Sequence, residues 1–321
     1  MITGWSGCSS APLGGDPETM AYFVALDGGG TKTECWVANE SSVLGRASTG
    51  SVKLMNVDEA TAASRLGDLV RAAAAEGGVA LNDVTRTCFG LAGSSSETVR
   101  KWAEQTLRSV VSGDVIISGD EEIALDAAFH GGPGVLVIAG TGSNIVGRCT
   151  DGTMQTAGGW GPMLGDEGSG HWIGVEAIKS ALRAQDRGVE TCMLKDIESH
   201  WGLHSQGELV AFANQRSRVE FAELTAVVAK CAENGDALAA SVLERAGHEL
   251  AEQVSLVASK MHHAGCAATD ALHVAFTGSV LGKISRVRKA MEEALPNFVV
   301  AQKAVEPLEG ALWRARGEQK F

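Results

Sequence analysis

The first segment that could do chemistry is a loop at residues 27–33, with the sequence Asp-Gly-Gly-Gly-Thr-Lys-Thr. Gly29 and Gly30 let the backbone approach a phosphate closely, and Thr31 and Lys32 add a hydroxyl donor and a positive charge. Asp27 offers a carboxylate that can hold Mg²⁺ directly or through water. A plain hairpin turn needs fewer glycines, so we interpret the segment as a phosphate-binding loop. Its spacing matches neither a Walker A loop nor G-x-G-x-x-G.

A second turn of this kind, Gly-Thr-Gly-Ser-Asn at residues 140–144, follows another apolar run about 110 residues later. Alone, this pattern fits an ordinary turn. As a second copy of the first loop it indicates a duplicated domain. Two such loops facing each other across a cleft would hold a triphosphate from both sides.

Asp120 stands where the apolar run 115–118 ends and a helix is expected to begin. One interpretation is a residue that caps the helix. The other is a general base that takes the proton of a substrate hydroxyl during phosphoryl transfer. The sequence alone leaves both open.

Residues 157–174 contain seven glycines in eighteen positions. Bare backbone makes a concave surface, Trp160 offers an apolar face, and Asp166 and Glu167 are hydrogen-bond acceptors. Sugars need this mixture, although a purely structural loop is the alternative. A late segment, Phe-Thr-Gly-Ser at 276–279, joins an expected strand to a helix and could receive adenosine or an anion.

Alternating strands and helices must position these segments. Strands are expected at 22–26, 34–38, 43–47, 84–91, 115–118, 135–138, 145–148 and 271–276, and helices at 58–75, 95–110, 121–129, 171–187, 283–294 and 307–316. Residues 190–263 are expected to be mostly helical. The pattern predicts an α/β protein with a mixed sheet in each half and one long helical insertion.

Composition excludes several functional classes. The 321 residues carry a net charge of −12, which argues against a general nucleic-acid binder. No apolar run is long enough for a membrane helix, and residues 1–20 lack the features of a signal peptide, so they are expected to be a flexible leader. Seven scattered cysteines predict reduced thiols rather than a disulfide framework. His262, His263 and Cys266 are not interpreted as a zinc site, because histidines at a helix end complement the helix dipole.

Together these segments resemble a known family. The loops at 27–33 and 139–144, Gly-Gly-Trp-Gly at 158–161, Gly-Asp-Glu-Gly-Ser-Gly at 165–170 and Thr-Gly-Ser at 277–279 are similar, in order, to the N-acetylglucosamine kinases. More broadly they resemble the BadF/BadG/BcrA/BcrD-type ATPases of the actin-like ATPase and sugar kinase superfamily. The resemblance covers residues 21–317.

The resemblance implies two ribonuclease-H-like (actin-like ATPase) domains around a cleft that binds ATP and sugar. The first would comprise 21–130 with 309–321, and the second 131–308. Asp120 would be the catalytic base and Asp27 would organise Mg²⁺. Nucleotide contacts carry over to Gly29, Gly30, Thr31, Lys32, Thr141, Ala222, Ser279 and Lys283. Sugar contacts carry over to Asn56, Ser143, Asn144, Gly159, Trp160, Gly161 and Asp166. The family's Ser-Thr-Asn segment is replaced here by residues 52–56, Val-Lys-Leu-Met-Asn.

We therefore expect a cytoplasmic, homodimeric kinase that uses ATP and Mg²⁺ to phosphorylate the 6-hydroxyl of an amino sugar, with no nucleic-acid or membrane partner. N-acetylglucosamine is the first substrate and glucosamine the second. The alternatives are an ATPase that drives a protein partner and a sugar sensor without turnover. The cysteine spacing does not support the iron–sulfur cluster of the reductase-activating branch, and the cysteine-rich zinc loop of ROK kinases is absent.

Overall fold

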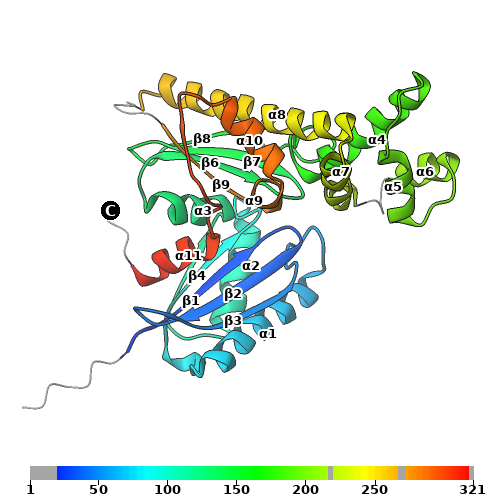
Figure 1. The fold of residues 1–321 in the computed structure, drawn as a ribbon. Coiled ribbons are helices and arrows are strands. Elements are labelled where there is room, and N and C mark those ends of the chain that lie inside the picture. Colours follow the sequence, from blue (N-terminus) through cyan, green and yellow to red (C-terminus); the bar gives the residue numbers. More distant parts are fainter. Residues whose placement is uncertain (1–19, 216–219, 267–271, 318–321) are drawn as a thin grey trace, which may run out of the picture.

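The computed structural model describes residues 20–215, 220–266 and 272–317. Two five-stranded mixed sheets lie one above the other, and helices cover their faces (Figure 1). The first sheet contains β1 (Tyr22–Gly28), β2 (Lys32–Ala38), β3 (Val43–Gly50), β4 (Val84–Leu91) and β5 (Asp114–Ser118). The second contains β6 (Gly134–Ala139), β7 (Ser143–Arg148), β8 (Met154–Gly158), β9 (His273–Thr277) and β10 (Val299–Val300).

The two sheets have the same topology. Their strand orders are β3-β2-β1-β4-β5 and β10-β9-β6-β7-β8, so β6 corresponds to β1 and β9 to β4. In each, three antiparallel strands are followed by two that run parallel to the first. The predicted α/β class with two mixed sheets is confirmed. The short strands β8 and β10 were not among the expected ones.

The helices largely follow the sequence pattern. They are α1 (Glu59–Gly77), α2 (Glu97–Arg108), α3 (Asp120–Phe129), α4 (Gly170–Asp186), α5 (Met193–Trp201), α6 (Gln206–Ala213), α7 (Leu224–Glu233), α8 (Ala237–His263), α9 (Ser279–Lys283), α10 (Ser285–Glu293) and α11 (Pro307–Arg316), with short 3-10 turns at Leu81–Asp83 and Phe221–Glu223. Local signals set their ends. The Asp58 carboxylate accepts the Thr61 N–H at the start of α1, and Gly78 ends that helix in the left-handed conformation.

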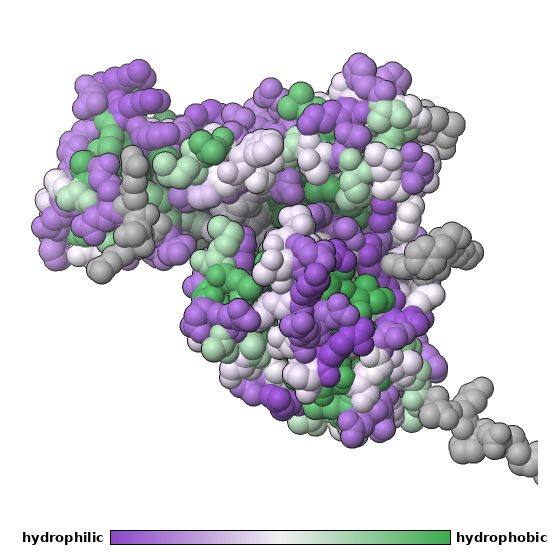
Figure 2. Space-filling view, turned by 180° about the vertical axis from the view of Figure 1, so that it is seen from behind, coloured by the Kyte–Doolittle hydropathy of each residue, from purple (hydrophilic) through white to green (hydrophobic). Residues whose placement is uncertain are grey.

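The helical insertion comprises α4 to α8, between β8 and β9. Helices α5 and α6 project beyond the second sheet (Figure 1). The space-filling view shows a notch beneath this projection, between it and the lobe that contains the first sheet (Figure 2).

Helices α3 and α11 lie between the two sheets and pack closely against each other (Figure 1). A side chain at Gly310 of α11 would collide with the carbonyl oxygen of Ile123 in α3, so glycine is required at this contact. Leu308, Ala311 and Leu312 of α11 pack on the first sheet. Ala124 and Leu125 of α3 pack on the second. The helix pair therefore joins the two halves of the molecule.

A buried charge network ties these helices to the second sheet. Asp126 of α3 is 1% exposed and accepts a 2.6 Å hydrogen bond from Nη1 of Arg148 in β7. The same carboxylate is paired with Arg314 of α11. Arg314 also donates to Ser118 Oγ at 2.6 Å and to Glu122 at 3.0 Å. A buried charge without a partner destabilises the folded state, so the loss of any one of these side chains should destabilise the protein.

One expectation about cysteines is wrong. Cys149 and Cys266 form a disulfide, although they are 117 residues apart in the sequence. Spacing could not reveal this pairing, because it depends on the end of α8 returning beside the end of β7. Cys35, Cys88, Cys192 and Cys231 are free. Since Cys266 is bonded, its sulfur does not join the two neighbouring histidines as a thiolate.

The expected leader, residues 1–20, lies outside the described residues except for Met20. Within the described ranges, no helix is long and apolar enough to cross a membrane. The predicted domain boundaries remain a proposal, which the packing of α11 on the first sheet supports.

Candidate active site

The topology brings the chemistry-bearing loops to corresponding ends of the two sheets. In the first sheet, β1, β4 and β5 run parallel, so the loop after β1 and Asp120 after β5 lie at the same edge. In the second sheet, β6 and β9 run parallel, which places Gly140–Gly142 beside Thr277–Ser279. Open α/β sheets bind ligands at this edge.

The first loop leaves backbone donors free. Among the described residues, no acceptor pairs with the N–H groups of Gly29, Gly30 or Thr31. The loop is held from behind, because Asn56 Nδ2 donates to the Gly30 carbonyl at 2.8 Å. Neighbouring unpaired N–H groups form an anion-binding concavity. Asn56, predicted to contact sugar, thus lies against the phosphate loop.

Asp27 lies in an acidic environment beside this loop. Burial, together with the negative charges of Glu306 and Glu34, raises the pKa of its carboxyl to about 7, although the positive charge of Lys32 lowers it. Lys32 itself is paired with Glu34 at 2.8 Å. A divalent cation would relieve this repulsion, so the environment of Asp27 fits the predicted Mg²⁺.

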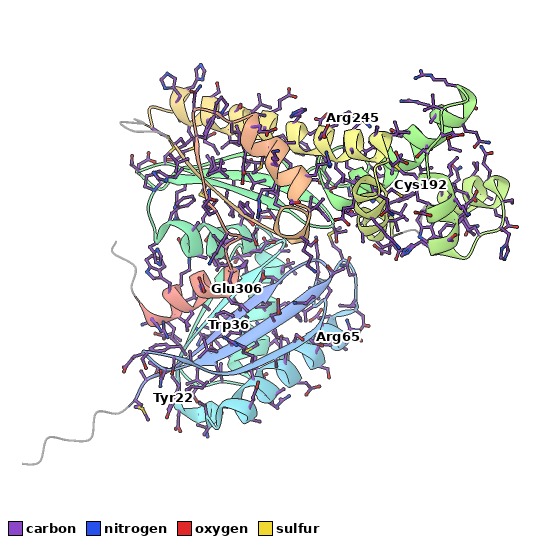
Figure 3. All side chains as sticks on the ribbon, in the orientation of Figure 1. Tyr22, Trp36, Arg65, Cys192, Arg245 and Glu306 are labelled. Atoms are coloured by element: carbon purple, nitrogen blue, oxygen red, sulfur yellow. A yellow bond between two sulfur atoms is a disulfide. The ribbon has the colours of Figure 1, made fainter. Side chains whose placement is uncertain are left out.

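Glu306 was missed by the sequence analysis. It precedes α11 and lies between the two sheets (Figure 3). The chain before it is fixed to the second sheet, because Val305 N–H donates to the Phe276 carbonyl at 2.8 Å and Thr277 Oγ1 donates to the Val305 carbonyl at 3.1 Å. This pairing with β9 brings the charge of Glu306 near enough to Asp27 of β1 to raise the pKa of Asp27. No local motif marks it.

The second loop has the same character as the first. The N–H groups of Thr141 and Gly142 have no acceptor within the described ranges. The start of α4 supports the loop, because Gly170 N–H donates to Gly140 O at 2.8 Å and His171 N–H donates to Thr141 O at 3.1 Å.

Two predicted nucleotide residues adjoin this loop. Ala222 lies against Gly170, and Ser279 follows Gly278, whose positive φ of 97° lets the turn pack on Ala139 and Gly140. Lys283 ends the short helix α9 that Ser279 begins, and it lines a cavity of about 470 Å³ with residues of α7, α8 and α10. Its role as a nucleotide contact stays a prediction.

The predicted sugar residues converge around Asp166. This residue is 6% exposed, has a positive φ of 61°, and accepts the Gly161 N–H at 3.1 Å. Burial raises the pKa of its carboxyl, while the N–H groups of Gly161 and Ser143 and nearby His171 lower it. The carboxylate also lies so close to Gly142 that a side chain there would strike it. The second glycine-rich loop and the predicted sugar-binding segment are thus adjacent.

The remaining sugar residues border the same place. Ser143 Oγ donates to the Glu167 carbonyl at 2.8 Å, and the Asn144 side chain packs against Gly159. Trp160 is 74% exposed, and Met163 and Leu164 beside it are similarly exposed. Trp160 therefore has a free aromatic face for a ligand.

Asp120 is the first residue of α3, and Gly119 precedes it at the cap position. The structure gives Asp120 no capping hydrogen bond, and its role as a catalytic base stays a prediction. Its neighbour Glu121 is hydrogen-bonded to it, and this bond, with burial and the charge of Asp120, raises the pKa of Glu121 to about 7. Glu121 can therefore hold a proton near neutral pH beside Asp120.

The comparisons with known proteins agree with this arrangement. The sequence model of the BadF/BadG/BcrA/BcrD ATPase family matches residues 24–314. A curated relative, "N-acetylmuramic acid/N-acetylglucosamine kinase" of Clostridium acetobutylicum, is 32% identical over 74% of this chain and 79% of its own length. The N-acetyl-D-glucosamine kinase of Dictyostelium discoideum is 26% identical over 93% of this chain and 98% of its own length. A glucosamine kinase of Vibrio cholerae is 26% identical over 91% of this chain and 95% of its own length.

Solved structures share the fold. A Chromobacterium violaceum protein, provisionally named an N-acetylglucosamine kinase, has a TM-score of 0.71 and 25% identity over 92% of this chain and 98% of its own. A ROK hexokinase of Thermus thermophilus has a TM-score of 0.54 over 92% and 98%, with 14% identity, which concerns the fold alone.

Proposed function

Because the chain belongs to the BadF/BadG/BcrA/BcrD ATPase family, we propose that it is an ATP-dependent kinase that phosphorylates the 6-hydroxyl of an amino sugar. N-acetylglucosamine is the first substrate, and the product is N-acetylglucosamine 6-phosphate. Both of the first two relatives named above carry N-acetylglucosamine kinase in their names.

One observation supports phosphoryl transfer most strongly. Two loops with free backbone N–H groups occupy equivalent positions in two sheets of identical topology. Each can stabilise the negative charge that spreads over phosphate oxygens in the transition state. We assign the phosphates of ATP to Gly29, Gly30, Thr31, Lys32 and Thr141, and the nucleoside side to Ala222, Ser279 and Lys283.

Asp120 is the proposed general base that acts on the sugar. In the proposed reaction its carboxylate takes the proton of the 6-hydroxyl while the hydroxyl oxygen attacks the γ-phosphorus, and ADP leaves. Protonated Glu121 would donate a hydrogen bond to the same carboxylate and hold it in place. Asp166, Ser143, Asn144 and Gly159–Gly161 would bind the sugar hydroxyls, Trp160 would cover its apolar face, and Asn56 would contact it at the phosphate end.

Mg²⁺ belongs to this proposal as well. When bound, it would neutralise charge on the phosphates, and Asp27 would hold it directly or through water. The acidic surroundings of Asp27 support this assignment.

Glucosamine is the second candidate substrate, and the Vibrio cholerae relative favours it. ADP release from ATP and Mg²⁺ should be measured with N-acetylglucosamine, glucosamine, N-acetylmuramic acid and glucose. We expect the first sugar to accelerate release most. If no sugar changed the rate of ADP release, the kinase proposal would be refuted, and the ATPase alternative would remain.

We also propose a homodimer that acts in the cytoplasm, where ATP is supplied. Light scattering on purified protein tests the dimer, and fractionation of cells tests the compartment. The Cys149–Cys266 disulfide is unusual for a reducing compartment, so its redox state in cells should be measured at the same time.

A further inference from the structure

Two free cysteines meet in the helical insertion. Cys192 precedes α5, Asp196 lies one turn into that helix, and Cys231 lies near the end of α7. Their two Sγ atoms and one carboxylate oxygen all lie within 4.8 Å of one another. Cys231 Sγ also donates to Asp196 Oδ2 at 3.3 Å.

These separations suit a small tetrahedral ion. With metal–sulfur bonds of about 2.3 Å, ligand atoms of a tetrahedral zinc site lie roughly 3.8 Å apart. The three atoms therefore need only a small contraction to surround one ion. Two thiolates and a carboxylate favour Zn²⁺ over Mg²⁺, because thiolates are soft ligands.

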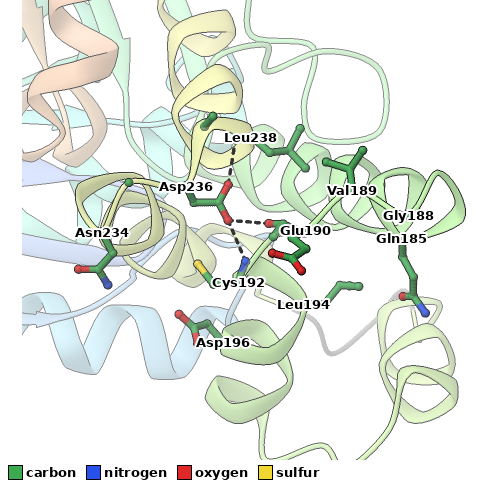
Figure 4. Close-up of a pocket in the computed structure, with 13 residues that line it drawn as sticks. Gln185, Gly188, Val189, Glu190, Cys192, Leu194, Asp196, Asn234, Asp236 and Leu238 are labelled. Carbon is green, nitrogen blue, oxygen red and sulfur yellow. Dashed lines mark hydrogen bonds between the residues drawn. The ribbon is translucent and has the colours of Figure 1, made fainter.

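The chain at Cys192 is held in place from outside the cluster. Asp236 Oδ2 accepts the Cys192 N–H at 2.8 Å and the Thr191 hydroxyl at 2.7 Å, while Oδ1 caps α8 through the N–H groups of Leu238 and Ala239. Figure 4 shows these bonds around Cys192. Supporting contacts of this kind orient metal ligands.

One side of the cluster faces an open cavity. Cys192 and Asp196 line a cavity of about 1030 Å³, together with Glu190, Asn234 and Asp236 (Figure 4). Cys231 is fully buried behind them. An ion could enter from the cavity and keep a water molecule as its fourth ligand.

We propose that Cys192, Asp196 and Cys231 bind one Zn²⁺ ion, which fastens α5 to α7. On binding, each thiol releases its proton to solvent and its sulfur coordinates the ion. The site is separate from the proposed Mg²⁺ at Asp27. Its role is structural, because it would fasten α5, which projects beyond the second sheet, to α7.

The full-length protein tests this site. It should be freed of metal with a chelator in a phosphine reductant, reloaded with Zn²⁺, passed through a desalting column and analysed for metal. We expect one zinc per chain, and thiolate-to-metal absorption when Co²⁺ replaces Zn²⁺. Cys192→Ser and Cys231→Ser should retain no zinc. Cys88→Ala, which removes a buried free thiol elsewhere, should retain it fully.

Thermal unfolding separates ligand loss from misfolding. Zn²⁺ should raise the melting temperature of the starting protein and of Cys88→Ala. Asp196→Asn should melt like the metal-free protein and respond less to Zn²⁺. Absence of bound zinc in the starting protein, equal zinc loss in Cys88→Ala, or a Cys192–Cys231 disulfide found by mass spectrometry in air-purified protein would overturn the proposal.

Discussion

Glu121 is hydrogen-bonded to Asp120 at the first turn of α3, and this bond is the largest cause that raises the pKa of Glu121 from 4.5 to about 7. A carboxyl with a raised pKa beside the proposed catalytic base is a feature found at active sites. The relationship has a consequence for stability that does not depend on any ligand.

Glu121→Gln should change how stability depends on pH. Between the unfolded pKa of 4.5 and the folded pKa of about 7, the folded protein keeps a proton that the unfolded chain has lost, so stability falls as pH rises through this window. Glutamine does not titrate, so the variant should not show this fall in stability. Urea denaturation at about pH 5 and about pH 8 should show the variant gaining relative to the starting protein at the higher pH. Glu97→Gln on exposed α2 is the control, and an equal difference at both pH values would contradict the assignment.

Asp27 should couple Mg²⁺ binding to pH. Its pKa of about 7 means that the carboxyl holds a proton below neutrality, and the ion must displace it. The protein should be titrated calorimetrically with ADP in the presence of Mg²⁺. As pH rises above about 7, ADP and Mg²⁺ should bind more tightly, and fewer protons should be released on binding. Asp27→Asn should abolish the Mg²⁺ contribution, whereas Glu40→Gln on the exposed β2–β3 turn should not. Mg²⁺-dependent affinity that is unchanged in Asp27→Asn would remove Asp27 from this role.

Asp166 should affect the sugar and spare the nucleotide. A hydrogen bond to a charged group contributes about 1.5–3 kcal/mol, so Asp166→Asn should raise the KM for the sugar roughly 10–100-fold while the affinity for ATP stays nearly constant. Trp160→Ala should act in the same direction without loss of stability, because the side chain is 74% exposed. Met163→Ala, equally exposed in the same loop, is the matched control. A parallel loss of ATP affinity would place Asp166 in the nucleotide site instead.

Asp126→Asn should destabilise the protein strongly. It leaves Arg148 and Arg314 without their buried partner, and breaking such a pair costs about 3–5 kcal/mol. The exposed pair Arg108–Glu104 is the comparison, where Glu104→Gln should cost at most about 1 kcal/mol. Chemical denaturation of both variants measures the difference, and similar values would mean that the buried network does not join the two halves.

The sequence predicted the local features well. Strand 84–91 and helix 307–316 have the expected bounds. β-Branched and apolar residues favour the strand locally, and Pro307 and Gly317 mark the ends of the helix. The duplicated loops after β1 and β6 were also recognisable, since each follows an apolar run and combines several glycines with threonine.

Features that depend on distant contacts were not predictable. Glu306 approaches Asp27 only because residue 305 pairs with β9, and Cys149 meets Cys266 only because α8 returns to β7. Cys192 and Cys231 are 39 residues apart, and only the packing of α5 on α7 brings them together. The two-residue strand β10 is too short to give a pattern of its own.

The most direct test of the account is the reaction of ATP and Mg²⁺ with N-acetylglucosamine, followed by phosphorus–proton correlated NMR of the product, for the starting protein and for Asp120→Asn. We expect phosphate on the 6-oxygen, and a kcat in the variant lower by roughly 10²–10⁴-fold with sugar binding retained. Absence of any sugar phosphate from the starting protein, or a nearly normal kcat in Asp120→Asn, would contradict it.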